Sequence, residues 1–195
     1  AEITLGGYHK DETIAEEQLP LKYVGVSHCY RTEAGAYGRE SYGLYRVHQF
    51  AKVEMFIFCA PEQSEALHLD LLRLEERVFT KLGIPYQVID ICSGDLGGRR
   101  NIKYNLEAWM WGRGDGKGGY GEVTSTSNCT DYQSRRLNVR MKRKDGSLVY
   151  AHTLNGTAVS LARALICILE NYQQEDGSIK VPEVLIPYTG FDIIK

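Results

Sequence analysis

Two segments of the chain have the spacing of apolar residues that is typical of an α-helix. The first begins at Pro61, a favoured first helical position, and ends at Gly83, with Pro85 shortly beyond it. Its apolar residues recur every three or four positions: Leu67, Leu71, Leu74, Val78 and Leu82. The second segment runs from about Ala158 to Tyr172 and is apolar on almost every side, which predicts a buried helix.

Much of the remaining sequence favours β-strands. Residues 21–33 and 44–58 form two such segments, joined by a loop at 34–43 that contains three glycines. Two shorter segments, 137–143 and 147–155, flank Lys144-Asp145-Gly146, which is a hairpin signal.

Strands joined through hairpins, with few and separate helices, predict an α+β fold on an antiparallel sheet. The glycine-rich stretch 111–121 fits this arrangement as an exposed loop between two strands. A parallel nucleotide-binding sheet would require regular alternation of strands and helices, and the sequence does not have it.

The predicted strand 44–58 carries an unusual set of side chains on one face, because side chains alternate between faces along a strand. One face has a composition suited to a core: Tyr45, Val47, Gln49, Ala51, Val53, Met55 and Ile57. The other face mixes aromatic rings with single charges of both signs: Arg46, His48, Phe50, Lys52, Glu54, Phe56 and Phe58. An edge strand with one solvated face explains this pattern, and so does a concave site for a flat, multiply charged ligand. If the strand pairs with 21–33, then Arg31 and Glu33, which are two residues apart, would converge on the same surface.

Arg163 is a second anomaly, because it lies in a helical segment with almost no other polar surface. A buried guanidinium without a partner is costly. Either an internal ion pair, for example with a core glutamate, or a phosphate of a bound ligand could supply the missing negative charge.

The composition argues against some classes of function and indicates the kind of compartment. The 195 residues are 43% hydrophobic and 25% charged, with a formal net charge of −2, so a chain whose main task is to grip a nucleic-acid backbone is disfavoured. No apolar stretch has the length of a membrane span, so no membrane partner is expected. The five cysteines are scattered singly and suggest reduced thiols, hence a cytoplasmic protein or one of an organellar matrix.

Four stretches of the chain resemble the seryl-tRNA synthetase family, a branch of the class II aminoacyl-tRNA synthetases. CYRTEAGAYGRESYGLYRVHQFAKVE (29–54) resembles the second signature motif of the class, and LNGTAVSLARALICILEN (154–171) resembles the third, with Arg163 at its arginine position. EVTSTSNCTDYQSRR (122–136) and VPEVLIPY (181–188) resemble the segment between them and the C-terminal end.

The resemblance implies that residues 1–195 are a catalytic (aminoacylation) domain built on an antiparallel sheet flanked by helices. The family's N-terminal tRNA-binding arm and first signature motif are absent from this sequence, which starts within the serine-recognition element at Ala1 and Glu2. The implied activity is a ligase reaction in which serine is activated with ATP to seryl-adenylate and transferred to the 3′ end of tRNA(Ser). Mg²⁺ is the implied cofactor besides ATP, and a homodimer is implied for the full-length protein.

The resemblance also assigns roles to individual residues. Arg31 and Arg163 would be the catalytic pair, binding the α- and γ-phosphates of ATP. The residues assigned to ATP are Arg31, Glu33, Arg46, Val47, His48, Phe50, Glu122, Ser125 and Arg163, with Phe50 stacking on adenine. The residues assigned to serine are Glu2, Arg31, Lys52, Glu54, Asn155 and Thr157. Glu122 and Ser125 would hold Mg²⁺, which requires a bulge or twist, because a regular pleat puts them on opposite faces.

Two other classes of function stay open beside the enzyme. One is a non-enzymatic synthetase-like paralogue that serves as a structural or interaction subunit, and the other is a paralogue that loads serine onto a carrier protein. Loss of Arg31, Glu54 or Arg163 would be the usual mark of the first, and all three are present.

Overall fold

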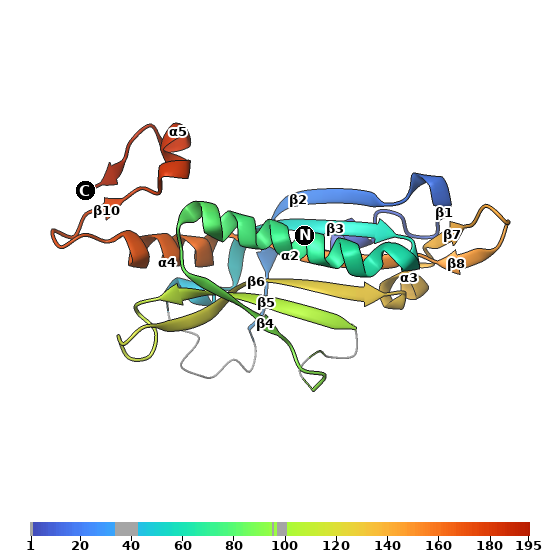
Figure 1. Cartoon of the computed structure of the whole chain (residues 1–195), viewed down its shortest axis with the longest axis horizontal. Coiled ribbons are helices and arrows are strands. Elements are labelled where there is room, and N and C mark those ends of the chain that lie inside the picture. The colour runs from blue at the N-terminus through green and yellow to red at the C-terminus, as the bar shows by residue number, and fades with distance from the viewer. Residues whose placement is uncertain (1, 34–42, 95, 97–100) are drawn as a thin grey trace.

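A six-stranded sheet forms the centre of the computed structural model, which describes residues 2–33, 43–94, 96 and 101–195 (Figure 1). Its strands, in spatial order, are β2 (Leu21–Tyr30), β3 (Gln49–Cys59), β9 (His152–Ser160), β6 (Gly119–Thr130), β5 (Ile102–Met110) and β4 (Tyr86–Asp90). Every pair of neighbours in this sheet is antiparallel. The prediction of an α+β fold on an antiparallel sheet is therefore confirmed.

The long helix α2 (Ser64–Leu82) covers one face of this sheet and packs on β5, β6 and β9 (Figure 1). A 3-10 turn, η4 (Pro61–Gln63), precedes it, so the predicted start at Pro61 is confirmed with that turn included. The helix ends at Gly83, whose φ of +66° lies in the left-handed region that glycine adopts without strain. Leu67 and Leu71 are buried beneath the helix, whereas Leu74 of the predicted apolar stripe is half exposed.

A second, small sheet stands at one end of the molecule. It consists of β1 (Thr13–Ala15), β7 (Arg140–Lys142) and β8 (Leu148–Tyr150). β1 and β7 run parallel, an exception to the antiparallel rule, whereas β7 and β8 form the predicted hairpin. Phe56 and Phe58 are completely buried in a core against this sheet, so the expectation that they share a ligand-facing surface is wrong.

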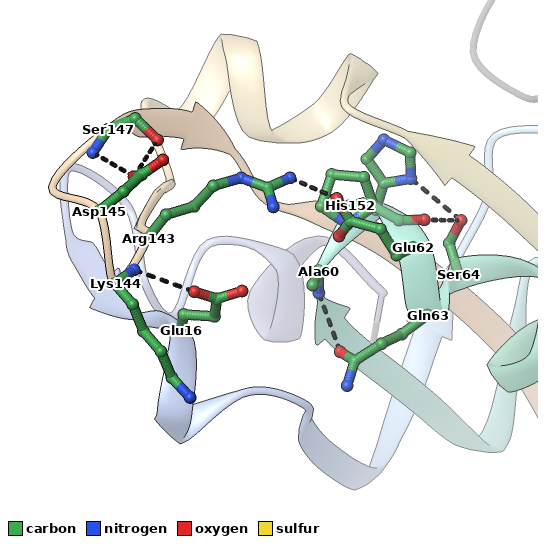
Figure 2. A network of polar contacts seen from close by, with 11 residues as sticks. Glu16, Ala60, Glu62, Gln63, Ser64, Arg143, Lys144, Asp145, Ser147 and His152 are labelled. Carbon is green, nitrogen blue, oxygen red and sulfur yellow. Dashed lines mark hydrogen bonds and ion pairs between the residues drawn. The ribbon is translucent and has the colours of Figure 1, made fainter.

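Polar contacts tie the β7–β8 hairpin to the turn η4, which precedes α2, and to the 3-10 turn η1 (Glu16–Gln18) (Figure 2). Arg143 pairs with Glu62, and the backbone N–H of Lys144 donates to Glu16 Oε2 over 3.0 Å. In the turn itself, Asp145 accepts hydrogen bonds from the backbone and the hydroxyl of Ser147. The hairpin is thereby fixed beside the sheet, and none of its residues lines the cavity described below.

The remaining elements are short. They are α1 (Glu2–Gly6), η3 (Gly43–Tyr45), α3 (Tyr132–Leu137), α4 (Leu161–Tyr172), β10 (Ile179–Lys180), η5 (Glu183–Leu185), α5 (Ile186–Thr189) and β11 (Ile193–Ile194). In the segment after α4, Val184 and Leu185 of η5 pack against the core that contains Phe79 of α2 and Leu106 of β5 (Figure 1). None of the helices in the described ranges is both long enough and apolar enough to cross a membrane.

The two strands of the second motif are shorter than the sequence predicts. β2 ends at Tyr30, so Arg31 and Glu33 lie beyond it, with Glu33 at a φ of +50°. β3 begins at Gln49, and the residues before it include the 3-10 turn η3. The antiparallel pairing itself is present, with Cys29 opposite Phe50. The predicted loop 34–43 falls outside the described residues except for Gly43.

The predicted helix 158–172 needs two corrections. It begins at Leu161, because residues 158–160 belong to β9: Val159 and Ser160 pair with Val53 and Lys52 of β3 after a bulge at Ala158. It is also not buried on all sides. Leu161 and Leu165 are each 46% exposed, and only Ala164 and Cys167 are fully buried.

Glu75 is a carboxyl group buried at the centre of α2, on the side that faces the sheet. Its side chain has no exposure, and Thr124 donates a hydrogen bond to its Oε2 over 2.8 Å. Its Oε1 has no hydrogen-bond partner within the described part of the chain. Burial raises the pKa of Glu75 well above its ordinary value of 4.5, and the nearby carboxylates of Glu54 and Glu122 act in the same direction.

This raised pKa predicts a specific dependence of stability on pH. The folded protein holds a proton on Glu75 that the unfolded chain releases above about pH 4.5, so stability falls as the pH rises from there through the native pKa. The isosteric change Glu75→Gln is expected to remove this loss and raise Tm at pH 8, by roughly 2–4 °C for each 1 kcal/mol gained. Thermal unfolding between pH 4.5 and 8.5 measures it, with Glu65→Gln on the exposed side of the same helix as control. If Tm falls with rising pH equally in Glu75→Gln and in the unchanged protein, the assignment of this pH dependence to Glu75 is refuted.

Candidate active site

A cavity opens on the sheet at its β3, β9 and β6 strands and is bounded by the start of α4 and by the segments next to β2 and β3. It is lined by Glu2, Arg31, Glu33, Leu44, Tyr45, Arg46, Val47, Phe50, Lys52, Glu54, Glu122, Val123, Thr124, Ser125, Asn155, Thr157, Ser160, Ala162 and Arg163. Residues more than 150 positions apart in the sequence therefore share one wall.

Every residue that the sequence assigned to a ligand lines this cavity, with the exception of His48. The His48 ring is exposed, and its Nδ1 lies 3.0 Å from the backbone oxygen of Arg31, outside the lining. The sequence did not point to six of the lining residues: Leu44, Tyr45, Val123, Thr124, Ser160 and Ala162. Tyr45 packs against the core around Phe79 and Leu106, as the strand pattern predicted, and it lines the cavity as well, which the pattern did not predict.

Glu54 is the buried carboxylate of the cavity. It is 2% exposed and forms an ion pair with Lys52 Nζ at 2.7 Å. The Thr157 hydroxyl donates a hydrogen bond to the same oxygen, Oε2, over 3.1 Å. Burial raises the pKa of Glu54, and the Lys52 ammonium opposes this shift. A small ligand with a hydroxyl or amine donor would find a strong, partly desolvated acceptor here.

Glu2 closes the same end of the cavity from a distant part of the chain. Its Oε1 accepts hydrogen bonds from Asn155 Nδ2 at 3.2 Å and from Gln133 Nε2 at 3.0 Å. Gln133 in turn accepts a hydrogen bond from the Thr153 hydroxyl. The two carboxylates, Glu2 and Glu54, are close enough for Glu2 to contribute to the raised pKa of Glu54. This end of the cavity suits a cationic ammonium group.

Arginines occupy the wall next to β2. The Arg31 guanidinium lies over the Phe50 ring, 5.2 Å from its centroid. Arg46 donates from Nε to Glu33 Oε2 over 2.5 Å, an ion pair that fixes both side chains at the cavity edge. An aromatic face beside guanidinium groups suits a flat ring with attached phosphates.

Arg163 enters the cavity from the first turn of α4. Its Nη1 donates to the backbone oxygen of Glu122 over 2.7 Å, and its Nε donates to the backbone oxygen of Tyr45 over 3.3 Å. The Glu122 carboxylate is 4.0 Å away, at the limit of an ion pair. The partners are thus chiefly backbone carbonyls rather than a core glutamate. These two bonds use two of the five N–H donors of the guanidinium, which leaves donors for a phosphate.

A bulge in β6 brings Glu122 and Ser125 to the same side of the sheet. The register with β5 shifts here, because Leu106 faces Thr124 while its neighbour Glu107 faces Glu122. Val123 is the extra residue, and it packs in the core with α2 and α4. Glu122 and Ser125 both line the cavity as a result. One carboxylate and one hydroxyl suit Mg²⁺, which keeps several waters and takes further oxygens from substrate phosphates.

The chain is similar in sequence and in fold to known proteins of one family. Residues 2–172 match the family described as the tRNA synthetase class II core domain (G, H, P, S and T). The serine–tRNA ligases of Dictyoglomus thermophilum and Treponema denticola are 65% and 63% identical to the chain over its whole length. The chain spans 45% and 46% of the length of these curated relatives.

Two solved structures are similar to the chain in fold as well as in sequence. The seryl-tRNA synthetase of Pyrococcus horikoshii, complexed with ATP, matches with a TM-score of 0.91 and 50% identity, over 97% of this chain and 42% of its own. The cytoplasmic serine–tRNA ligase of Naegleria fowleri, in complex with AMP, matches with a TM-score of 0.92 and 42% identity, over 98% of this chain and 45% of its own.

Proposed function

Because this chain belongs to the class II tRNA synthetase core family, we propose that its protein is an enzyme that activates serine with ATP and transfers it to tRNA(Ser). The observation that carries the proposal is the single cavity in which the arginines, the aromatic ring and the buried carboxylate meet. ATP use is supported by the ATP and AMP complexes of the two similar structures. We also propose that a second copy of the full-length protein is its partner in a homodimer. Its proposed location is the cytoplasm or an organellar matrix.

The cavity divides between two substrates. Serine would bind at the carboxylate end, where Glu54, Asn155 and Thr157 surround its side chain and Glu2 accepts its ammonium group. Its hydroxyl would donate to Glu54, and alanine would leave that buried acceptor without this bond. The adenine would stack on Phe50, with Glu33 and the backbone near Val47 at its edge.

The first reaction would need no nucleophile from the protein. The serine carboxylate attacks the α-phosphorus of ATP, its oxygen forms the new bond, and pyrophosphate leaves with the electron pair of the broken bond. Arg31 would hold the carboxylate and the α-phosphate in line, and Arg163 would neutralise charge on the γ-phosphate. The terminal hydroxyl of tRNA would then attack the carbonyl of seryl-adenylate and displace AMP.

Glu122 and Ser125 would hold Mg²⁺, which supplies charge neutralisation on the phosphates when bound. Glu122→Gln is expected to raise the Mg²⁺ concentration needed for half-maximal pyrophosphate exchange by about tenfold, because one of the few anionic ligands is lost. Calorimetric titration of ATP in the absence of Mg²⁺ should give an affinity close to that of the unchanged protein. Equal Mg²⁺ requirements would contradict the assignment.

The test of the function itself is serine-dependent exchange of labelled pyrophosphate into ATP by the full-length protein. Exchange with serine, followed by transfer of serine to tRNA(Ser), supports the proposal. Absence of exchange in the folded protein favours the non-enzymatic paralogue. Exchange without transfer to tRNA, but with transfer to a carrier protein, favours the carrier-loading paralogue.

A further inference from the structure

Tyr45 stands where three groups at the phosphate end of the cavity meet. Its hydroxyl donates to the backbone oxygen of Glu122 over 2.9 Å, and the same oxygen accepts the bond from Arg163 Nη1. Its own backbone oxygen accepts the second bond from Arg163, from Nε. The Arg163 guanidinium carbon lies 4.3 Å from the centroid of the Tyr45 ring. Tyr45, Glu122 and Arg163 thus form a closed ring of contacts that joins η3, β6 and α4.

This ring of contacts restricts the long arginine side chain. A guanidinium on a flexible stem otherwise samples many rotamers, and its affinity for a phosphate falls with every orientation that points elsewhere. The face of Tyr45 attracts the cation and sets the plane of the guanidinium. The bond from the Tyr45 hydroxyl holds the β6 backbone at Glu122, where Arg163 is anchored.

A second cation lies against the same tyrosine. The Arg113 guanidinium carbon is 5.0 Å from the centroid of the Tyr45 ring. It packs close to Gly121, where an added Cβ would lie 2.8 Å from its Nη1, so a side chain at that position would displace it. The Tyr45 ring therefore lies against the guanidiniums of both Arg113 and Arg163.

We propose that Tyr45 is a positioning residue for the terminal phosphate of ATP, acting through Arg163. The proposal rests on the proposed function, because it takes the γ-phosphate of ATP as the ligand of Arg163. It assigns a role to a residue that strand alternation placed in the core. It also gives a role to both contacts of the Tyr45 side chain. The ring holds the Arg163 guanidinium directly, and the hydroxyl holds the Glu122 backbone oxygen to which Arg163 donates.

The test compares Tyr45→Leu and Tyr45→Phe in the full-length protein. Tyr45→Leu removes the ring face and the hydroxyl, and we expect the KM for ATP in pyrophosphate exchange to rise about tenfold or more. Tyr45→Phe keeps the ring, so a rise of only about threefold is expected. The KM for serine should change by less than about twofold in both, since its site is at the other end of the cavity. The dissociation constant for ATP, measured by calorimetry, should follow the KM for ATP.

The control is Tyr120→Phe, at a partly exposed tyrosine of β6 that contacts Trp109 and does not line the cavity. It should leave both KM values unchanged. A purely structural role for Tyr45 would instead lower kcat or the fraction of folded protein, or change both KM values together, and this result overturns the proposal. So does an unchanged KM for ATP in Tyr45→Leu. If the unchanged protein shows no serine-dependent exchange while Tyr45→Leu still weakens ATP binding, the proposed function fails and the role of Tyr45 in ATP binding stands.

Discussion

Arg163→Ala is expected to weaken ATP binding by a factor of about 10² to 10³ while leaving the fold nearly intact. The guanidinium is the cationic group that α4 extends into the cavity, and charge-assisted bonds from arginine to phosphate are roughly twice as strong as neutral ones. Its removal takes donors from two backbone oxygens, those of Glu122 and Tyr45. Both lie at the wall of an open cavity where water can replace the lost donor, so the loss of stability should be small.

Calorimetry with ATP measures the effect, and circular dichroism establishes that the variant is folded. Arg135→Ala is the matched control, because the Arg135 side chain is 53% exposed, pairs with Asp131 and does not line the cavity. Arg163→Lys separates charge from geometry: a lysine keeps the cation but not the planar fork, and we expect it to recover only part of the affinity. An ATP affinity that is unchanged in a folded Arg163→Ala would rule out the phosphate role.

Changes at Glu54 are expected to affect serine rather than ATP. Glu54→Gln keeps the size of the side chain but removes the charge that Lys52 and a bound serine share. We expect the KM for serine to rise by about 10² or more and the discrimination against alanine to fall by a similar factor. The KM for ATP should change by less than about threefold, because the phosphate end of the cavity is untouched.

Glu54→Ala is a harsher form of the same experiment. It leaves Lys52, whose side chain is 13% exposed, without its ion-pair partner. Breaking a buried pair in this way costs about 3–5 kcal/mol of stability, so the amount of folded protein must be measured beside the kinetics. Glu65→Gln, on the exposed side of α2, is the control for removal of a carboxylate. Equal serine affinity in wild type and Glu54→Gln would refute the assignment.

The sequence predicted the class of the fold because its local signals agree with the final packing. Pro61 and Gly83 mark the two ends of the segment that contains α2, and Lys144-Asp145-Gly146 marks the turn of the β7–β8 hairpin. Where local signals are weak, the boundaries were wrong. Residues 158–160 give no local signal that separates them from the helix that follows, and it is the pairing of Val159 and Ser160 with β3 that extends the strand to Ser160.

The sequence also identified candidate ligand residues, chiefly through its resemblance to the synthetase motifs, and the mixed charges and rings of the strand before Glu54 were consistent with them. It could not decide which of them share a cavity. His48 and Phe50 both lie in the same motif, yet only Phe50 lines the site. Tyr45 was missed as a site residue because the strand pattern assigned it to the core alone, whereas it lies in a 3-10 turn and lines the cavity as well.

What the sequence by itself determined is the family, the antiparallel architecture and the residue types of the site, all of which depend on local pattern and on motifs. What only the tertiary structure decided is how distant groups come together. Glu2 reaches Asn155 across most of the chain, and the bulge at Val123 brings Glu122 and Ser125 to one side. Arg163 is oriented by backbone oxygens of Glu122 and Tyr45. These contacts depend on register and packing, which arise from the whole sheet and leave no signature in any single segment.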